Sequence, residues 1–484
     1  MNKILLFFFS FLSFVQVINA QSIIQEPHPA DWLAGSWGIT FPVYGGERLD
    51  TEVAGGYNLP AGAQEVVDKL PAVGHVITNL SYFAHSHYFT LRGNDNVNVA
   101  TEIHESLVPS QANEAIIFDV MQKFKNSGKK VILYISTNYL DRADSATHAA
   151  WVNYYTTKFA GNEYLAYRNL IQGYISRVKD YADGYWLDTT AELDDDGHIE
   201  DFVAMIRQAD PGCAISASPN GAYFQKDGKN ILVDSDGIND VDERDYKIVS
   251  FEGVNKYQDF TSGHVTPLGQ GAPPNSWGYE EFTMPAMVAN PWDEFQGKKI
   301  LKHAWFPMRD KWHVSSANLI FGTEDAYRFA RTLIDGKAGV TFATTINDKS
   351  TGKGYLMAEE MTIMKAINDR LLSNPVPDYV PYARPEGAHL VGEVILSTPD
   401  FNTSGIGFYP NPAVDKLTIT RTATGIQYIR ITSTTGAKVL EKVWSNESLT
   451  TQIDLSSLNS GIYFLSLSNG NSTSFTRKII ITKY

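Results

Sequence analysis

Short apolar segments alternate with longer amphipathic segments between about residue 35 and residue 345. The short segments are rich in the β-branched and aromatic residues that favour strands, and the longer ones space their apolar positions three and four residues apart, as helices do. Helices are expected directly before three of the strands, over 115–125, 167–178 and 326–334. The eight predicted strands are 36–42, 75–83, 130–136, 184–188, 214–218, 248–252, 302–306 and 339–345. This alternation predicts a (β/α)8 TIM barrel.

An open, doubly wound parallel sheet would show the same alternation. Such sheets usually carry a glycine-rich phosphate-binding loop after their first strand. The first predicted strand, 36–42, is not followed by such a loop. We therefore prefer the closed barrel.

The pattern changes after a last predicted helix at 356–368. Beyond a Ser-, Thr- and Asn-containing stretch, short alternating strands are separated by Asn, Gly and Ser turns, which predicts a small all-β sandwich. The predicted organisation is a signal peptide at 1–20, a catalytic barrel at 21–394, a linker at 395–405 and a C-terminal domain at 406–484.

Targeting and charge limit the compartment and the partners. A basic residue, an apolar run and a small-residue cleavage site ending at Ala20 are typical of a secretory signal, and no later apolar run approaches the length of a membrane helix. A formal net charge of -14 argues against nucleic acid as a partner. The lone Cys213 excludes an internal disulfide and is expected in the core.

The last 80 or so residues resemble the C-terminal sorting domain of the type IX secretion system of Bacteroidetes. The resemblance rests on motifs in the expected order, at 408–413, 417–419, 434–436, 453–465 and 477–483. It implies export across both membranes, with the secretion machinery as a partner and a secreted or cell-surface location.

Two of the predicted strands end in an acid, Asp188 after 183–187 and Glu252 after 248–251. Strand ends at the C-terminal face of a barrel form its active site, although an Asp there can also cap the next helix. Two carboxyl groups about 5 Å apart can cleave a glycosidic bond with retention. The apolar Phe251 beside Glu252 favours a neutral carboxyl, so Glu252 is the expected acid and Asp188 the nucleophile.

The segment 183–188, Asp-Gly-Tyr-Trp-Leu-Asp, resembles the nucleophile strand of α-L-fucosidases. The order of the strands and the two acids are similar to the secreted endo-α-1,3-L-fucanases of glycoside hydrolase family 168. The first strand lacks the histidine of the fucosidases, which disfavours an exo-acting enzyme. The resemblance implies that Asp188 is the nucleophile and Glu252 the acid/base.

Further polar and aromatic residues follow the predicted strands and are candidates for binding sugar hydroxyls and sulfate, although each also fits an ordinary packing or hydrogen-bonding role. Arg309 is the expected sulfate ligand, with a surface pair to Asp310 as the alternative. The substrate-binding candidates are His85, His87, Asn138, Tyr139, Asn220, Trp305 and Arg309.

No cofactor and no metal site are expected. The His85–His87 pair lacks an obvious third zinc ligand. Two acidic loops, 192–200 and 233–240, contain an Asp-x-Asp-Gly core, but Val203 replaces the expected bidentate glutamate in the first, which favours solvated loops over calcium sites.

The sequence therefore predicts a secreted glycoside hydrolase that cleaves α-L-fucosyl linkages in sulfated fucan, endo-acting and retaining. A non-catalytic glycan-binding protein and a hydrolase of another sulfated algal polysaccharide are the alternatives.

Overall fold

The computed structural model describes most of the chain. The chain forms two compact units, Met1–Pro385 and Glu386–Tyr484, which are considered separately. The described residues are 27–81, 88–93, 99–140, 143–190, 193–194, 196–218, 223–226, 229–232, 247–248, 252–253, 255–263, 280, 284–349, 351–383, 406–422, 428–445, 448–468 and 473–483.

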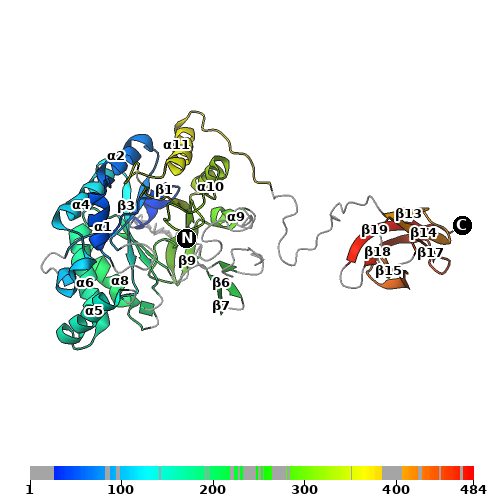
Figure 1. Ribbon diagram of the computed structural model, residues 1–484, viewed down its shortest axis with the longest axis horizontal. Helices are drawn as coiled ribbons and strands as arrows, with labels where there is room; N and C mark the ends of the chain where they lie inside the picture. The colour runs from blue at the N-terminus through cyan, green and yellow to red at the C-terminus, as the bar shows by residue number, and fades with distance from the viewer. Residues whose placement is uncertain are drawn as a thin grey trace, which may run out of the picture. The chain divides into compact units, whose positions relative to one another are not determined.

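The first unit is built on a curled parallel sheet of seven strands (Figure 1). The strand order is β11-β12-β1-β2-β3-β4-β5, with parallel pairing throughout. The strands are β1 (Trp37–Thr40), β2 (His75–Asn79), β3 (Lys130–Ser136), β4 (Gly184–Asp188), β5 (Ala214–Ala217), β11 (His303–Pro307) and β12 (Gly339–Ala343). Seven of the eight predicted strands are thus confirmed as members of one parallel sheet.

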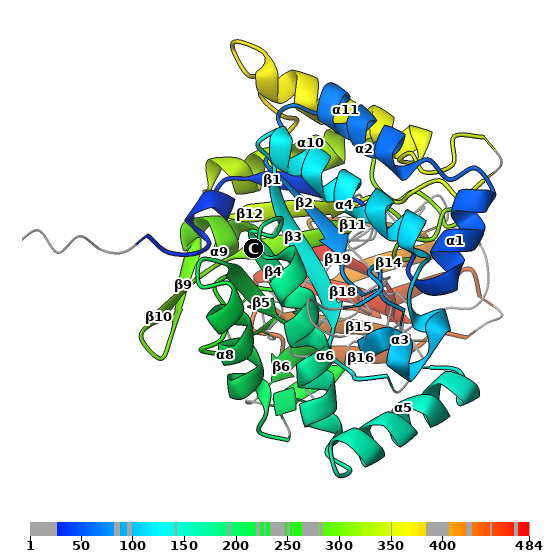
Figure 2. The same cartoon turned by 90° about the vertical axis from the view of Figure 1, so that its left-hand side faces the viewer.

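The α-helices lie outside the curled sheet, as the views in Figures 1 and 2 agree. Apolar side chains from the helices and from the outward strand positions form one large core, as expected of βα units. The helices are η1 (Asp31–Leu33), α1 (Gly46–Ala54), α2 (Leu59–Lys69), α3 (Val99–Ile103), η2 (Glu105–Leu107), α4 (Gln111–Asn126), α5 (Ser145–Lys158), α6 (Glu163–Val178), α8 (Ile199–Ala209), α9 (Met284–Ala289), α10 (Thr323–Asp335) and α11 (Ala358–Leu372).

The predicted sixth strand is wrong in its placement. Ile248 belongs to β8 (Lys247–Ile248), which pairs antiparallel with β6 (Tyr223–Lys226) in a small separate sheet with β7 (Lys229–Leu232). Residues 249–251 lie outside the described residues. A segment later in the chain, 259–261, instead makes backbone hydrogen bonds to Ile215 of β5 and to Leu301 of β10 (Lys298–Leu301). The region next to the β5 edge therefore comes from a stretch that the hydrophobic pattern did not single out.

A second, smaller core lies inside the curve of the sheet. It combines inward residues of β2, β3, β4, β5, β11 and β12 with residues from η1 and from the segment around Phe260. Near the N-terminal ends of the strands, His75 and His303 are both fully buried and share the hydroxyl of Thr341, at 2.8 and 2.7 Å. Burial lowers the pKa of both imidazoles, to about 4 for His303, so both are neutral at pH 7.

The second unit contains two antiparallel sheets around a core of its own. One sheet has the order β13-β14-β17 and the other β16-β15-β18-β19. The strands are β13 (Ile406–Tyr409), β14 (Lys416–Arg421), β15 (Tyr428–Ser433), β16 (Lys438–Val443), β17 (Thr450–Asp454), β18 (Gly461–Ser468) and β19 (Thr473–Ile481). An all-β C-terminal region was predicted, and the structure confirms it.

Among the described residues, no helix is both long and apolar enough to cross a membrane.

Candidate active site

Asp188 is the last residue of β4 and lies on the inner side of the sheet. Side chains alternate along a strand, and Trp186 belongs to the inner core whereas Tyr185 and Leu187 belong to the outer one. Asp188 is two residues beyond Trp186, so it shares the inward face and is only 7% exposed. This places its carboxylate at the C-terminal end of the strands, the end at which barrel enzymes have their active sites.

Both carboxylate oxygens of Asp188 accept a hydrogen bond. Tyr134 of β3 donates its hydroxyl to Oδ2 at 2.5 Å, and the backbone N–H of Thr189 donates to Oδ1 at 2.9 Å. The backbone carbonyl of Asp188 also accepts bonds from the N–H and the hydroxyl of Thr137 and from the hydroxyl of Thr189. Two donors therefore orient the carboxylate, and three further hydrogen bonds hold the backbone of Asp188.

Thr189 adopts a left-handed backbone conformation, with φ at 58°. A β-branched residue is disfavoured there, at a cost of order 1–3 kcal/mol, and such strain concentrates at functional sites. Tyr139, after β3, and His313, after β11, also have positive φ values, of 52° each. Three loops that follow strands thus carry this feature.

An aromatic cluster lies directly beside the candidate nucleophile, inside the curled sheet. The ring of Tyr134 stacks on Trp186 at 5.5 Å, and Trp186 makes an edge contact with Trp305 at 4.7 Å. Trp305 was predicted to offer a face to a sugar, but its side chain is 1% exposed and its indole N–H bonds Thr40. In this structure Trp305 contributes to the buried floor beside Asp188.

Among the contacts of the described residues, none joins Glu252 to Asp188. Its side chain hydrogen-bonds Asp293, and the neighbouring Gly253 N–H donates to the same carboxylate at 2.9 Å. Asp293 belongs to β9 (Trp292–Phe295), where it pairs with Ile300 of β10, just before the start of β11. These contacts place Glu252 near the N-terminal end of β11, whereas Asp188 occupies the C-terminal end of β4.

The carboxyl groups of Glu252 and Asp293 form a close acidic pair. Burial tends to raise the pKa of Asp293, but hydrogen bonds from the N–H groups of Gly253 and Glu294 and a hydrogen bond with the side chain of Glu252 hold its pKa below the usual range. Asp293 and Glu252 are thus joined by a side-chain hydrogen bond.

Two predicted binding residues, Asn138 and Tyr139, lie in the loop after β3, next to the end of β4. Asn138 is 6% exposed, and its Oδ1 accepts the hydroxyl of Ser136 at 2.5 Å. Tyr139 is half-buried and packs edge-on against Tyr167. The structure thus brings both to the same end of the sheet as Asp188.

Arg309 is not a surface residue. Its side chain is 4% exposed and forms ion pairs with Glu359 and Glu360 of α11, and it also donates to the carbonyl of Ala317. Asp310, the alternative partner, instead bonds Asn318. The guanidinium is thus engaged within the protein, which opposes the predicted role in binding sulfate.

The remaining predicted residues, His85, His87 and Asn220, lie outside the described residues, as does the acidic loop 233–240. Within the described part of the chain, no group of three or more His, Cys, Asp or Glu side chains is arranged to hold a metal ion.

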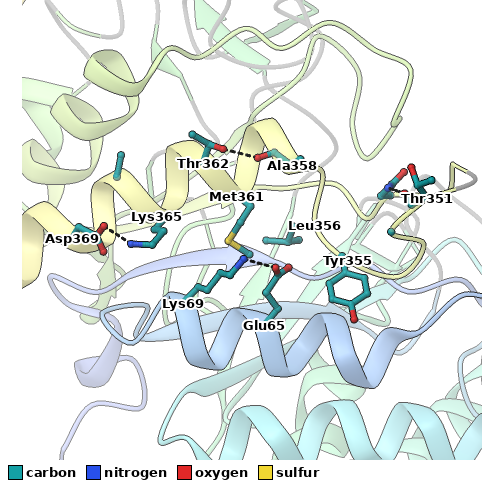
Figure 3. A pocket seen from close by; sticks show the side chains of 13 residues that line it. Glu65, Lys69, Thr351, Tyr355, Leu356, Ala358, Met361, Thr362, Lys365 and Asp369 are labelled. Atoms are coloured by element: carbon teal, nitrogen blue, oxygen red, sulfur yellow. Dashed lines mark hydrogen bonds and ion pairs between the residues drawn. The ribbon is translucent and has the colours of Figure 1, made fainter.

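A groove of ≈ 770 Å³ lies between α2 and α11 on the outer side of the first unit (Figure 3). Leu356 and Met361 contribute apolar side chains, and Lys69 and Lys365 are each paired with an acid on their own helix. Opposite charges in the groove balance one another, and the groove contains no residue of the Asp188 cluster. The groove is therefore distinct from the candidate active site.

Sequence reasoning missed Tyr134, Thr137 and Thr189. The pairing of β3 with β4 sets Tyr134 beside Trp186 and Ser136 beside Asp188. An inward-facing tyrosine two residues before a strand end could have been selected by alternation alone. The left-handed Thr189 left no signal in the sequence, because threonine is not typical of that conformation.

Residues 27–394 match the family model described as endo-alpha(1,4)-fucoidanase Mef1. The chain belongs to this endo-fucoidanase family. Residues 407–482 match the model of the secretion system C-terminal sorting domain. The protein is therefore a glycoside hydrolase that is secreted or held at the cell surface, and the tail resemblance is confirmed.

Solved structures agree with this family assignment. The endo-fucoidan hydrolase P5AFcnA from glycoside hydrolase family 107 is 47% identical, with a TM-score of 0.68, over 76% of this chain and 100% of that one. The endo-fucoidan hydrolase MfFcnA9 of the same family is 13% identical, with a TM-score of 0.54, over 94% of this chain and 81% of that one, and shows likeness of fold alone. No curated protein matches the chain. The expected endo-fucanase is thus confirmed, whereas family 107 replaces the predicted family 168.

Proposed function

We propose that this endo-fucoidanase cleaves α(1→4)-linked L-fucosyl bonds within fucoidan, with retention of configuration and Asp188 as the nucleophile. The observation that carries the proposal is the strand-end carboxylate of Asp188, held by Tyr134 and by the strained Thr189. A glycan-binding protein has no use for a strained and immobilised carboxylate, which favours an enzyme. The α(1→4) linkage follows the family model and replaces the α-1,3 linkage first expected.

The proposed reaction has two steps. An oxygen of Asp188 attacks the anomeric carbon while the glycosidic C–O bond breaks and the leaving oxygen takes a proton from a general acid. Water then attacks the same carbon and gives its proton to the resulting base, and the bond to Asp188 breaks with its electron pair returning to the carboxylate.

Glu252 was expected to be that acid. A retaining pair needs carboxyl groups about 5 Å apart. The bond of Glu252 to Asp293, which lies before β11, ties it to the other end of the strands. These contacts argue against the predicted acid role of Glu252, which Glu252→Gln tests directly, and Asp188 is the residue on which the proposed site depends.

The closed (β/α)8 barrel remains a proposal that segment 258–263 supports. Thr261 donates its N–H to Leu301, and Trp305 donates to Gly263, while Asp259 donates to Ile215 of β5. A chain that bonds to both edge regions of the seven-stranded sheet would supply the missing eighth position. We further propose the domain limits 1–20, 21–394, 395–405 and 406–484, with the type IX secretion machinery as the partner of the last.

The function is tested by incubating the purified protein with fucoidan of known α(1→4) content and following chain length and anomeric configuration by NMR. We expect a ladder of oligosaccharides from early times and a first-formed α-anomer. Release of fucose alone, or a first-formed β-anomer, would contradict endo action or retention respectively.

A further inference from the structure

We infer that Tyr134 belongs to the catalytic machinery. Its hydroxyl stabilises, by a hydrogen bond, the negative charge that returns to Asp188 when the covalent intermediate is hydrolysed. The inference rests on the proposed role of Asp188 as nucleophile. It adds a residue whose contribution is specific to the second step of the reaction.

The packing of the Tyr134 ring directs its hydroxyl toward Asp188. The residue lies on β3 opposite Trp186, and its side chain is 2% exposed. Its ring is held on two sides, by stacking on Trp186 at 5.5 Å and by an edge contact with Trp305 at 6.5 Å. A ring fixed in this way directs its hydroxyl to Asp188 Oδ2 at 2.5 Å without further loss of rotamer freedom.

The strength of this bond changes during the reaction. Oδ2 belongs to an anion in the free enzyme and to a neutral ester in the glycosyl-enzyme, and hydrogen bonds to ionised acceptors are roughly twice as strong as neutral ones. Charge returns to the carboxylate as the bond between Asp188 and the anomeric carbon breaks. A donor already in place therefore stabilises the transition state of hydrolysis more than it stabilises the ester.

The same bond stabilises the carboxylate before attack and weakens as the carboxylate loses its charge, so it does not accelerate the first step. Removal of the hydroxyl is thus expected to slow hydrolysis of the intermediate selectively. Loss of a residue with a purely structural role would slow both steps to a similar extent.

The test compares Tyr134→Phe with Tyr185→Phe. Tyr185 is a fully buried tyrosine of β4 on the outer face, and its hydroxyl bonds Asp210 at 3.1 Å, so its variant loses a comparable hydroxyl away from the site. Both changes keep the ring. Steady-state kinetics on fucoidan are measured together with the mass of protein quenched in acid during turnover.

For Tyr134→Phe we expect kcat to fall by at least about tenfold, kcat/KM to fall less, and a glycosyl adduct to accumulate on the peptide that contains Asp188. For Tyr185→Phe we expect wild-type kcat. Equal losses in kcat and kcat/KM without an adduct, or no loss at all, would overturn the role of Tyr134.

Asp188→Asn in the same assay separates this inference from the proposed function. An inactive Asp188→Asn with a fully active Tyr134→Phe overturns only the inference. An active Asp188→Asn overturns the nucleophile assignment itself.

Discussion

Two buried ionisable residues, Asp188 and Arg309, differ in the partners that surround them. Asp188 accepts hydrogen bonds from uncharged donors alone among its described carboxylate contacts, the hydroxyl of Tyr134 and the N–H of Thr189. Arg309 is surrounded by two acids, and burial raises the pKa of the fully buried Glu360 to about 7. The Arg309 cluster is thus balanced internally, which is typical of a structural ion pair.

Replacement of Arg309 by alanine is expected to destabilise the protein without altering its preference for sulfated substrate. Removing one member of a buried pair leaves the carboxyl of Glu360 uncompensated, at a cost of about 3–5 kcal/mol in the free energy of unfolding. Chemical denaturation of Arg309→Ala measures this cost. Lys365→Ala, which breaks an exposed pair with Asp369 in the groove of Figure 3, is the control and should unfold like the wild type.

A selective loss of activity on sulfated fucan, with unchanged stability in Arg309→Ala, would restore the sulfate role and contradict this account.

Among the elements, short apolar segments predicted seven strands of the parallel sheet, because buried parallel strands are continuous apolar runs. The same principle explains the error at 248–252. That run is apolar, yet Ile248 pairs in a peripheral antiparallel sheet. The segment that bonds to β5 contains Asp259, whose side chain is 2% exposed and compensated by Arg207 and Lys298.

Such compensation depends on partners distant in sequence, and a hydrophobic pattern cannot reveal it. The candidate site shows the same division. Asp188 was found because it ends an apolar strand, whereas Glu252 was selected on the same ground after a run whose described residue Ile248 belongs to the antiparallel β8. Alternation along β3 could have selected Tyr134 as an inward residue, but its position beside Trp186 follows from the β3–β4 register.

The buried histidines beneath the inner core predict how stability depends on pH. Their folded pKa values lie below the unfolded value of about 6.5, so the unfolded chain binds more protons and stability falls as the pH drops from about 6.5 toward 4. Glu360, with a raised pKa, has the opposite dependence between about 4.5 and 7. The histidine contribution must therefore be isolated by a variant.

We expect His303→Gln to lose part of this pH dependence. The free energy of unfolding, measured by urea denaturation at pH 7.5 and pH 5, should change less in the variant than in the wild type, by up to about 1.4 kcal/mol per pH unit for one group. Identical pH dependence in both proteins would show that His303 is not buried in its neutral form.

On the scale of the whole molecule, the chain has two units with separate hydrophobic cores, and each matches a different family model. The first carries the parallel sheet, the aromatic floor and Asp188, and matches the endo-fucoidanase family. The second is all-β and matches the sorting domain. Catalysis and export thus belong to different parts of the chain, and the account of the reaction rests on the C-terminal end of one sheet.

The most direct test of that account is the rate of fucoidan cleavage by Asp188→Asn and Glu252→Gln, measured beside the wild type at matched protein stability. Loss of the nucleophile blocks the covalent step, so Asp188→Asn should lose at least about a hundredfold in kcat. Glu252 is hydrogen-bonded to Asp293, which precedes β11, so we expect it to be dispensable for chemistry. The kcat of Glu252→Gln should stay within about threefold of the wild type, because a residue outside the site does not alter the activation barrier. Wild-type turnover by Asp188→Asn, or equal inactivation of both variants, would contradict this account.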